Sequence, residues 1–126
     1  MTLLKIPYGI SNYRTIALEG YAYVDKTRFI RVLEEYPSPY QFFLRPRRFG
    51  KSLFVSLLNY YYDIAEKENF NALFHNTLIG SEPTPKCGAY YLLNFDFSGI
   101  ISSSQPELER SFANNTRFSL QNFIER

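Results

Sequence analysis

Hydrophobic residues recur at helical spacing in three parts of this chain. The clearest period predicts an amphipathic helix from Lys51 to about Ala65, with apolar positions Leu53, Phe54, Leu57, Leu58, Tyr61 and Ile64. A second helix is expected over Lys26 to Glu35, where Asp25 is placed to cap the first turn. The connection after it holds two prolines, which end that helix.

A third helix is expected after the sequence Ser104-Gln105-Pro106-Glu107, which has the serine and glutamate spacing of a capping box. Its periodic residues predict an inward face made of Leu108, Phe112, Leu120, Phe123 and Ile124. The polar stretch before it, from Glu66 to Ala89, predicts one short helix near Ala72 to Phe74. No stop signal precedes Arg126, so we expect the chain to be cut off inside its last helix.

Three short apolar stretches predict strands instead. Residues 21–24 form a short extended run, "YQFFLR" at 40–45 has the composition of a buried strand, and "YYLLNFDF" at 90–97 alternates like a second core strand. A strand, a tight basic loop and a helix then follow one another from Tyr40 to Ala65. This order predicts an α/β fold, a three-layer α/β/α arrangement with a parallel sheet of which the chain supplies the first part.

Composition narrows the class of protein. A chain of 126 residues is at most one domain, and 45% hydrophobic residues suit a globular protein with a core. A net charge of +2 does not by itself indicate nucleic-acid or membrane binding. One cysteine fits the reducing cytoplasm, where we expect the protein to be. No apolar run approaches the roughly 20 residues of a membrane helix, so no membrane partner is expected.

The loop after the first core strand carries the candidate chemistry. Gly50-Lys51-Ser52 is the second half of the phosphate-loop pattern G-x-x-x-x-G-K-[ST], while Arg45 stands where that pattern has its first glycine and Pro46 follows it. In such loops the backbone N–H groups and the lysine bind nucleotide phosphates, and the serine hydroxyl binds magnesium. We therefore expect nucleotide binding here, with Gly50 letting the backbone approach the phosphates.

Two longer motifs resemble one known family. "YVDKTRFIRVL" followed by "FFLRPRRFGKSLFVSLLNYYYDI" is similar to the predicted AAA-ATPase-like family of prokaryotic proteins, strongly over about the first 65 residues. The phosphate loop of that family has Arg-Pro at its entrance, so the resemblance implies that Arg45 and Pro46 belong to a variant form of the loop. It implies ATP and Mg²⁺ as cofactors, Lys51 as the catalytic residue and Ser52 as the metal ligand. It implies nucleotide contacts from Arg45, Pro46, Arg47, Arg48, Phe49, Gly50, Lys51 and Ser52.

The resemblance also implies the organisation of the chain. Residues 1–126 would be the N-terminal part of a P-loop domain, with an opening segment and helix (1–39), the strand, phosphate loop and helix (40–65), and a connection, second core strand and helix (66–126). The acidic strand that a P-loop ATPase needs is expected beyond residue 126, because Asp96 lacks an adjacent glutamate. ATP hydrolysis would then belong to the intact protein, often with a nuclease-like PD-(D/E)XK domain, and this part alone would be inactive.

The residues leave two other readings of the basic loop open. Arg45, Arg47, Arg48 and Lys51 also suit a non-catalytic regulatory module that binds nucleic acid or an acidic partner. Alternatively, the loop only packs. Whether the base is adenine or guanine, and whether a nucleic acid or protein partner binds through the missing C-terminal region, are open at this point.

Overall fold

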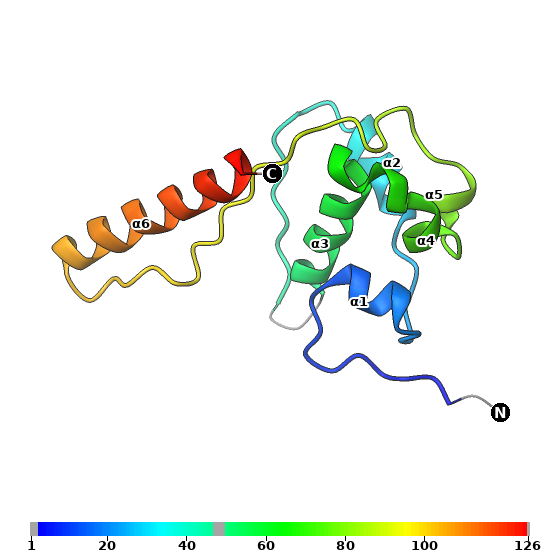
Figure 1. Ribbon diagram of the computed structural model, residues 1–126, viewed down its shortest axis with the longest axis horizontal. Coiled ribbons are helices and arrows are strands. Elements are labelled where there is room, and N and C mark those ends of the chain that lie inside the picture. The colour runs from blue at the N-terminus through cyan, green and yellow to red at the C-terminus, as the bar shows by residue number, and fades with distance from the viewer. Residues whose placement is uncertain (1–2, 47–49, 126) are drawn as a thin grey trace. The chain divides into compact units, whose positions relative to one another are not determined.

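The computed structural model describes residues 3–46 and 50–125, and this part of the chain is helical (Figure 1). Its elements are α1 (Tyr13–Leu18), α2 (Arg28–Glu35), α3 (Lys51–Tyr62), the 3₁₀ helix η1 (Ile64–Asn69), α4 (Phe70–Phe74), α5 (Leu78–Ser81) and α6 (Gln105–Ile124). The chain divides into two compact units, Met1–Tyr91 and Leu92–Arg126. The first unit holds α1 to α5, and the second holds α6.

The first unit is built around α3. Helix α1 packs against α3 and α4, while α2 packs against α5. Leu57 and Tyr61 point from α3 into a core that is completed by Tyr13, Ile16, Ile30, Leu73, Phe74 and Ile79. Two hydrogen bonds fix α1 on this core, because the Tyr13 hydroxyl donates to the Leu73 carbonyl (2.7 Å) and the Tyr13 N–H donates to the Ser56 hydroxyl (3.0 Å).

The predicted α/β fold with a parallel sheet is wrong for the described residues, which contain no strand. Within residues 3–46 and 50–125, two isolated parallel bridges join the backbone, Lys5 with Tyr21 and Asp63 with Tyr90. Residues 40–45 are extended but unpaired, and Tyr40 and Phe42 are 87% and 85% exposed. Strand composition indicates what suits a paired, half-buried surface, and a strand forms only where a neighbouring strand supplies the backbone partners. Among the described residues, segment 40–45 has no such neighbour, while segments 21–24 and 90–97 each pair at a single bridge, which is too short for a strand.

The predicted helices of the first unit are confirmed with shifted ends. Helix α2 begins at Arg28 because the Asp25 carboxylate accepts the Thr27 N–H (2.8 Å), which holds the two preceding residues in a turn. Helix α3 ends at Tyr62 because the Asp63 side chain accepts the Ala65 N–H (3.0 Å) and begins η1. The short helix expected near Ala72 is α4.

Helix α6 of the second unit begins as the sequence predicts. The Ser104 hydroxyl accepts the Glu107 N–H at the N-terminus of the helix. The predicted inward face is wrong, because no residue of α6 is buried, and Leu108, Phe112, Leu120 and Ile124 stay substantially exposed. Periodicity identifies the apolar face of a helix, whereas burial depends on a second element that covers it. Among the described residues, no helix is both long and apolar enough to cross a membrane.

Candidate functional site

The start of α3 is the Gly50-Lys51-Ser52 segment. Gly50 is the N-cap residue with φ 78° and ψ 20°, in the left-handed region that favours glycine. A Cβ atom at Gly50 would meet nothing within 4 Å, so the described surroundings leave space there and the backbone angle is what calls for glycine. The first helical bond runs from the Phe54 N–H to the Gly50 carbonyl (2.9 Å). The N–H groups of Lys51, Ser52 and Leu53 precede that bond and have no acceptor within α3.

Lys51 and Ser52 are both exposed on the first turn of α3. Within residues 3–46 and 50–125, neither side chain forms a hydrogen bond or an ion pair. A free hydroxyl beside uncapped backbone N–H groups suits a phosphate-bound magnesium ion, which takes oxygen ligands and keeps several waters. The donor set therefore fits Mg²⁺ that arrives with a nucleotide. No cluster of three acidic, histidine or cysteine residues in the described ranges would hold a metal ion by itself.

The loop before α3 is described only in part. The Arg45 guanidinium donates to the neighbouring Leu44 carbonyl (2.9 Å), and Pro46 is exposed and has no N–H to donate. The predicted nucleotide contacts at Arg47, Arg48 and Phe49 lie outside the described residues. The second half of the predicted site is thus placed at a helix start, and its entrance is placed only at Arg45 and Pro46.

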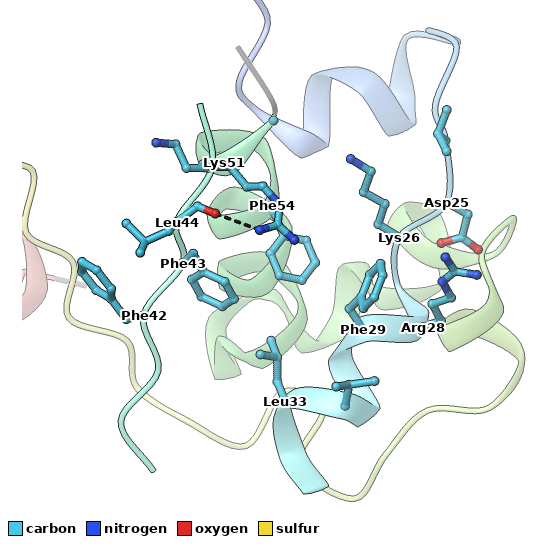
Figure 2. Close-up of a pocket in the computed structure, with 14 residues that line it drawn as sticks. Asp25, Lys26, Arg28, Phe29, Leu33, Phe42, Phe43, Leu44, Lys51 and Phe54 are labelled. Atoms are coloured by element: carbon cyan, nitrogen blue, oxygen red, sulfur yellow. Dashed lines mark hydrogen bonds between the residues drawn. The ribbon is translucent and has the colours of Figure 1, made fainter. Parts of the chain in front are cut away.

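A cavity of about 580 Å³ in the first unit extends from the start of α3 to α2 (Figure 2). Its walls come from three parts of the chain: the end of the "YVDKT" segment with α2, the extended segment 42–45, and the start of α3. Lining residues are Val24, Asp25, Lys26, Arg28, Phe29, Val32, Leu33, Phe42, Phe43, Leu44, Arg45, Gly50, Lys51 and Phe54. The fold thereby brings Asp25 and Lys26 to the same cavity as Arg45, Gly50 and Lys51.

Charge in this cavity is predominantly positive. Four of its described lining residues are basic, Lys26, Arg28, Arg45 and Lys51, whereas Asp25 is the one acidic residue among those described. Asp25 is engaged by the chain itself: Oδ1 accepts from the Thr27 N–H (2.8 Å) and hydroxyl (2.6 Å), and Oδ2 accepts from the Leu78 N–H (2.8 Å). The sequence predicts that Asp25 caps the helix, but Thr27 is the N-cap residue of α2 and no side chain caps its first turn, so Asp25 instead holds the turn before the helix. The cavity offers an anion four cations and a carboxylate already committed elsewhere.

The hydrogen bonds of Asp25 also determine the direction in which its pKa is shifted. Partial burial raises the pKa of this carboxyl, but hydrogen bonds from Thr27 and Leu78 and the charge of Arg28 outweigh burial and lower the pKa overall. Thr27 is fully buried, and its hydroxyl also accepts the Ile79 N–H (3.2 Å). Asp25 and Thr27 together tie the start of α2 to the start of α5.

Asp96 lies in the second unit. It lacks the adjacent glutamate expected of an acidic strand that holds magnesium. Its Oδ1 accepts the Ser98 N–H (2.9 Å), which makes it a turn residue. The side-chain and backbone hydrogen bonds from Ser98 lower the pKa of this exposed carboxyl. Nothing in this geometry prepares Asp96 for a metal ion.

Sequence reasoning missed the aromatic walls of the cavity. Phe29, Phe43 and Phe54 read as ordinary core positions of a helix, a strand and a helix, yet all three line the cavity. Phe43 meets Phe54 edge-on, with ring centroids 5.8 Å apart, and the Arg28 guanidinium lies 5.0 Å from the Phe29 ring centroid. One feature of the sequence hinted at this arrangement. Only a short connection separates the helix after "YVDKT", which has an apolar face, from the basic loop.

Comparison with known proteins agrees with the motifs. The chain is 50% identical over 60 residues to a protein of Azotobacter chroococcum mcd 1 described as "Uncharacterized protein in vnfD 5'region", a match that covers 46% of this chain and 11% of that protein. No solved structure is significantly similar to this chain. The sequence profile of the family described as "Predicted AAA-ATPase" matches residues 7–126. Since the match spans nearly the whole chain, this protein belongs to the predicted AAA-ATPase family.

Proposed function

We propose that the start of α3 binds the phosphates of ATP, together with Mg²⁺, as part of an ATPase. The observation that carries the proposal is Gly50 in the left-handed conformation, directly before Lys51 and Ser52, at a helix start with no side-chain cap. Uncapped N–H groups and the positive end of the helix dipole form a binding site for phosphate. The family of the chain and the four cations around the adjoining cavity support the same reading.

Each residue of the segment has a distinct role in this proposal. The N–H groups of Lys51, Ser52 and Leu53 donate to phosphate oxygens, and the Lys51 ammonium neutralises charge on the β- and γ-phosphates. The Ser52 hydroxyl holds Mg²⁺, which supplies charge neutralisation between these phosphates when it is bound. Arg45 and Pro46 form the entrance to the loop, with Arg47, Arg48 and Phe49 between them and Gly50.

Hydrolysis belongs, in this proposal, to a longer protein. The carboxylate that lines the cavity, Asp25, accepts hydrogen bonds from the chain at both oxygens, and its lowered pKa makes it a weak general base toward water. The other described lining residues carry no carboxylate. We therefore expect residues 1–126 to bind MgATP without turning it over. ATP turnover by this chain that Lys51→Ala abolishes would contradict this part of the proposal.

Isothermal titration of the purified chain with MgATP tests the proposal. Lys51→Ala is expected to weaken binding by at least about ten-fold, since a charge-assisted hydrogen bond contributes roughly 1.5–3 kcal/mol. Lys86→Ala is the matched control, because Lys86 is an exposed lysine that does not line the cavity. Equal effects of the two substitutions, or no binding by the unmodified chain, would refute nucleotide binding at α3.

The four cations also favour a second candidate function, the binding of nucleic acid or an acidic protein partner by a regulatory module. The two functions differ in how they respond to magnesium and salt. ATP binding should need Mg²⁺ and weaken in Ser52→Ala. Polyanion binding should tolerate Ser52→Ala and fall steeply with salt, because it releases counterions. A titration with single-stranded DNA at two salt concentrations separates them.

A further inference from the structure

We propose that the apolar part of the cavity beside α3 holds the base of the bound nucleotide, stacked on Phe29. The inference rests on the proposed nucleotide binding and adds a second subsite to it. The cavity of about 580 Å³ has a size typical of small-molecule sites. It is continuous with Gly50 and Lys51, so a ligand whose phosphates lie at the start of α3 has room for its remaining part there.

Polarity changes along the cavity in the way that a nucleotide requires. Figure 2 shows the side chains of Lys51 and Lys26 toward one end of the view and Leu33 toward the other. Phe29 on α2 and Phe43 on segment 42–45 lie on opposite sides, and Phe54 lies between them. The aromatic section carries one further charge, since the Arg28 guanidinium lies 5.0 Å from the Phe29 ring centroid. A lysine-rich end followed by a section with three aromatic rings fits a ligand with phosphates at one end and an aromatic ring at the other.

The rings that would contact the base are accessible without rearrangement of the core. Phe29 and Phe43 are 41% and 42% exposed, whereas the nearby core residue Ile30 is fully buried. Phe43 is already oriented by its edge contact with Phe54. A base that covers these rings removes apolar surface from water and stacks on a π-face, which is favourable for any base.

Stacking also predicts which nucleotides the site accepts. Asp25, the one carboxylate among the described lining residues, is held by hydrogen bonds to the chain at both oxygens, so we expect the ring faces to dominate contact with the base. Recognition by the faces of rings favours the larger purines over pyrimidines and separates adenine poorly from guanine. MgGTP should therefore compete with MgATP at a similar concentration, and MgUTP should compete at a higher one.

Titrations with two probes test the subsite, MgATP and magnesium with inorganic triphosphate. Phe29→Ala should weaken MgATP binding by about ten-fold and leave inorganic triphosphate unchanged, because only ATP has a base to stack. Phe43→Ala, on the opposite wall, should weaken MgATP binding to a similar extent. Phe29→Tyr keeps an aromatic ring and should bind MgATP as the unmodified chain does. Phe118→Ala is the matched control, since Phe118 is 65% exposed on α6 and does not line the cavity.

The outcomes separate the two proposals. If MgATP and triphosphate bind and Phe29→Ala and Phe43→Ala leave MgATP unchanged, or weaken both probes equally, the base subsite is refuted while phosphate binding stands. If the unmodified chain binds neither probe, both proposals are wrong. Circular dichroism of each variant shows that the helices are retained, and Phe29→Tyr, which keeps the ring, distinguishes lost stacking from a damaged fold.

Discussion

Helices α3 and α6 begin in opposite ways. Helix α6 starts at Ser104, whose hydroxyl accepts the Glu107 N–H, and Glu107 places an acidic side chain in the first turn. Helix α3 starts at Gly50, which has no side chain to cap with, and its first turn holds no acidic residue. An acidic residue and a cap compensate the positive end of a helix. The start of α6 is thus satisfied by its own chain, while the start of α3 has no side-chain cap and no first-turn acid, which is the condition that the proposed phosphate site requires.

The same two helices also differ in what their apolar faces contact. Helix α3 buries Leu57 and Tyr61 in the core of the first unit, while none of the residues of α6 is buried. Helix α3 is therefore held by a buried core, whereas α6 is held by its cap, its own backbone bonds and surface contacts with the preceding segment, such as the stacking of Phe112 on Phe97. The comparison teaches that the uncapped start lies on the anchored helix, where a binding segment is held in place by a packed core.

The largest effect is expected from removing the anchor of α3. Leu57→Ala leaves a cavity in the core and should lower the free energy of unfolding of the first unit by about 2–5 kcal/mol. Leu120→Ala on α6 is the matched substitution at an exposed position and should change stability by less than about 0.5 kcal/mol. Urea denaturation of both variants measures the difference. Similar losses would show that Leu120 stabilises the chain as much as the buried Leu57 does, contrary to the comparison.

Helices were predictable in this chain because their signals are local. Asp25 before α2 and the Ser104-Pro106 sequence before α6 act on backbone groups one turn away, and both were read from the sequence. Their ends moved by two or three residues where a side chain formed a competing turn, as Asp63 does after α3. Local side-chain to backbone hydrogen bonds thus explain both why these helices were predicted and why their predicted ends were displaced.

Strands and cavity walls depend on distant residues, so the sequence did not predict them correctly. The segment 40–45 has strand composition, but no extended neighbour pairs with it among the described residues. The position of Gly50-Lys51-Ser52 at a helix start followed from the motif and the helical period. That Phe29 and Phe43 share a cavity with Lys51 was not readable, because only the fold brings α2 and segment 42–45 to α3.

The second prediction concerns the backbone at the start of α3. Gly50→Ala should destabilise the first unit by roughly 1–2 kcal/mol, because an L-residue with a Cβ atom is strained at φ 78°. Gly99→Ala is the control, since Gly99 lacks a positive φ and its added Cβ would also meet nothing within 4 Å. Thermal unfolding followed by circular dichroism measures both. If Gly50→Ala is as stable as Gly99→Ala, α3 does not need a glycine at its start.

The third prediction concerns the cap that α3 lacks. Ser104→Ala removes the hydroxyl that accepts the Glu107 N–H and should cost about 1 kcal/mol of helix stability. Ser102→Ala, an exposed serine outside the cap, should have no effect. Amide hydrogen exchange at Glu107 and the following residues is the direct measurement. Unchanged exchange in Ser104→Ala would mean that α6 does not depend on its cap.

The smallest effect is expected at Asp25, whose carboxylate holds the turn before α2. The pKa of Asp25 is lowered in the folded chain, despite partial burial, by hydrogen bonds from Thr27 and Leu78. Its stabilising contribution is therefore complete above its unfolded pKa of about 3.9 and is lost as the pH falls through the lower folded value. The melting temperature of the unmodified chain should fall more steeply below about pH 4 than that of Asp25→Asn. Asp96→Asn, in an exposed turn of the second unit, should leave the acid sensitivity of the first unit unchanged. Parallel pH profiles for the unmodified chain and Asp25→Asn would show that the turn before α2 does not depend on the charge of Asp25.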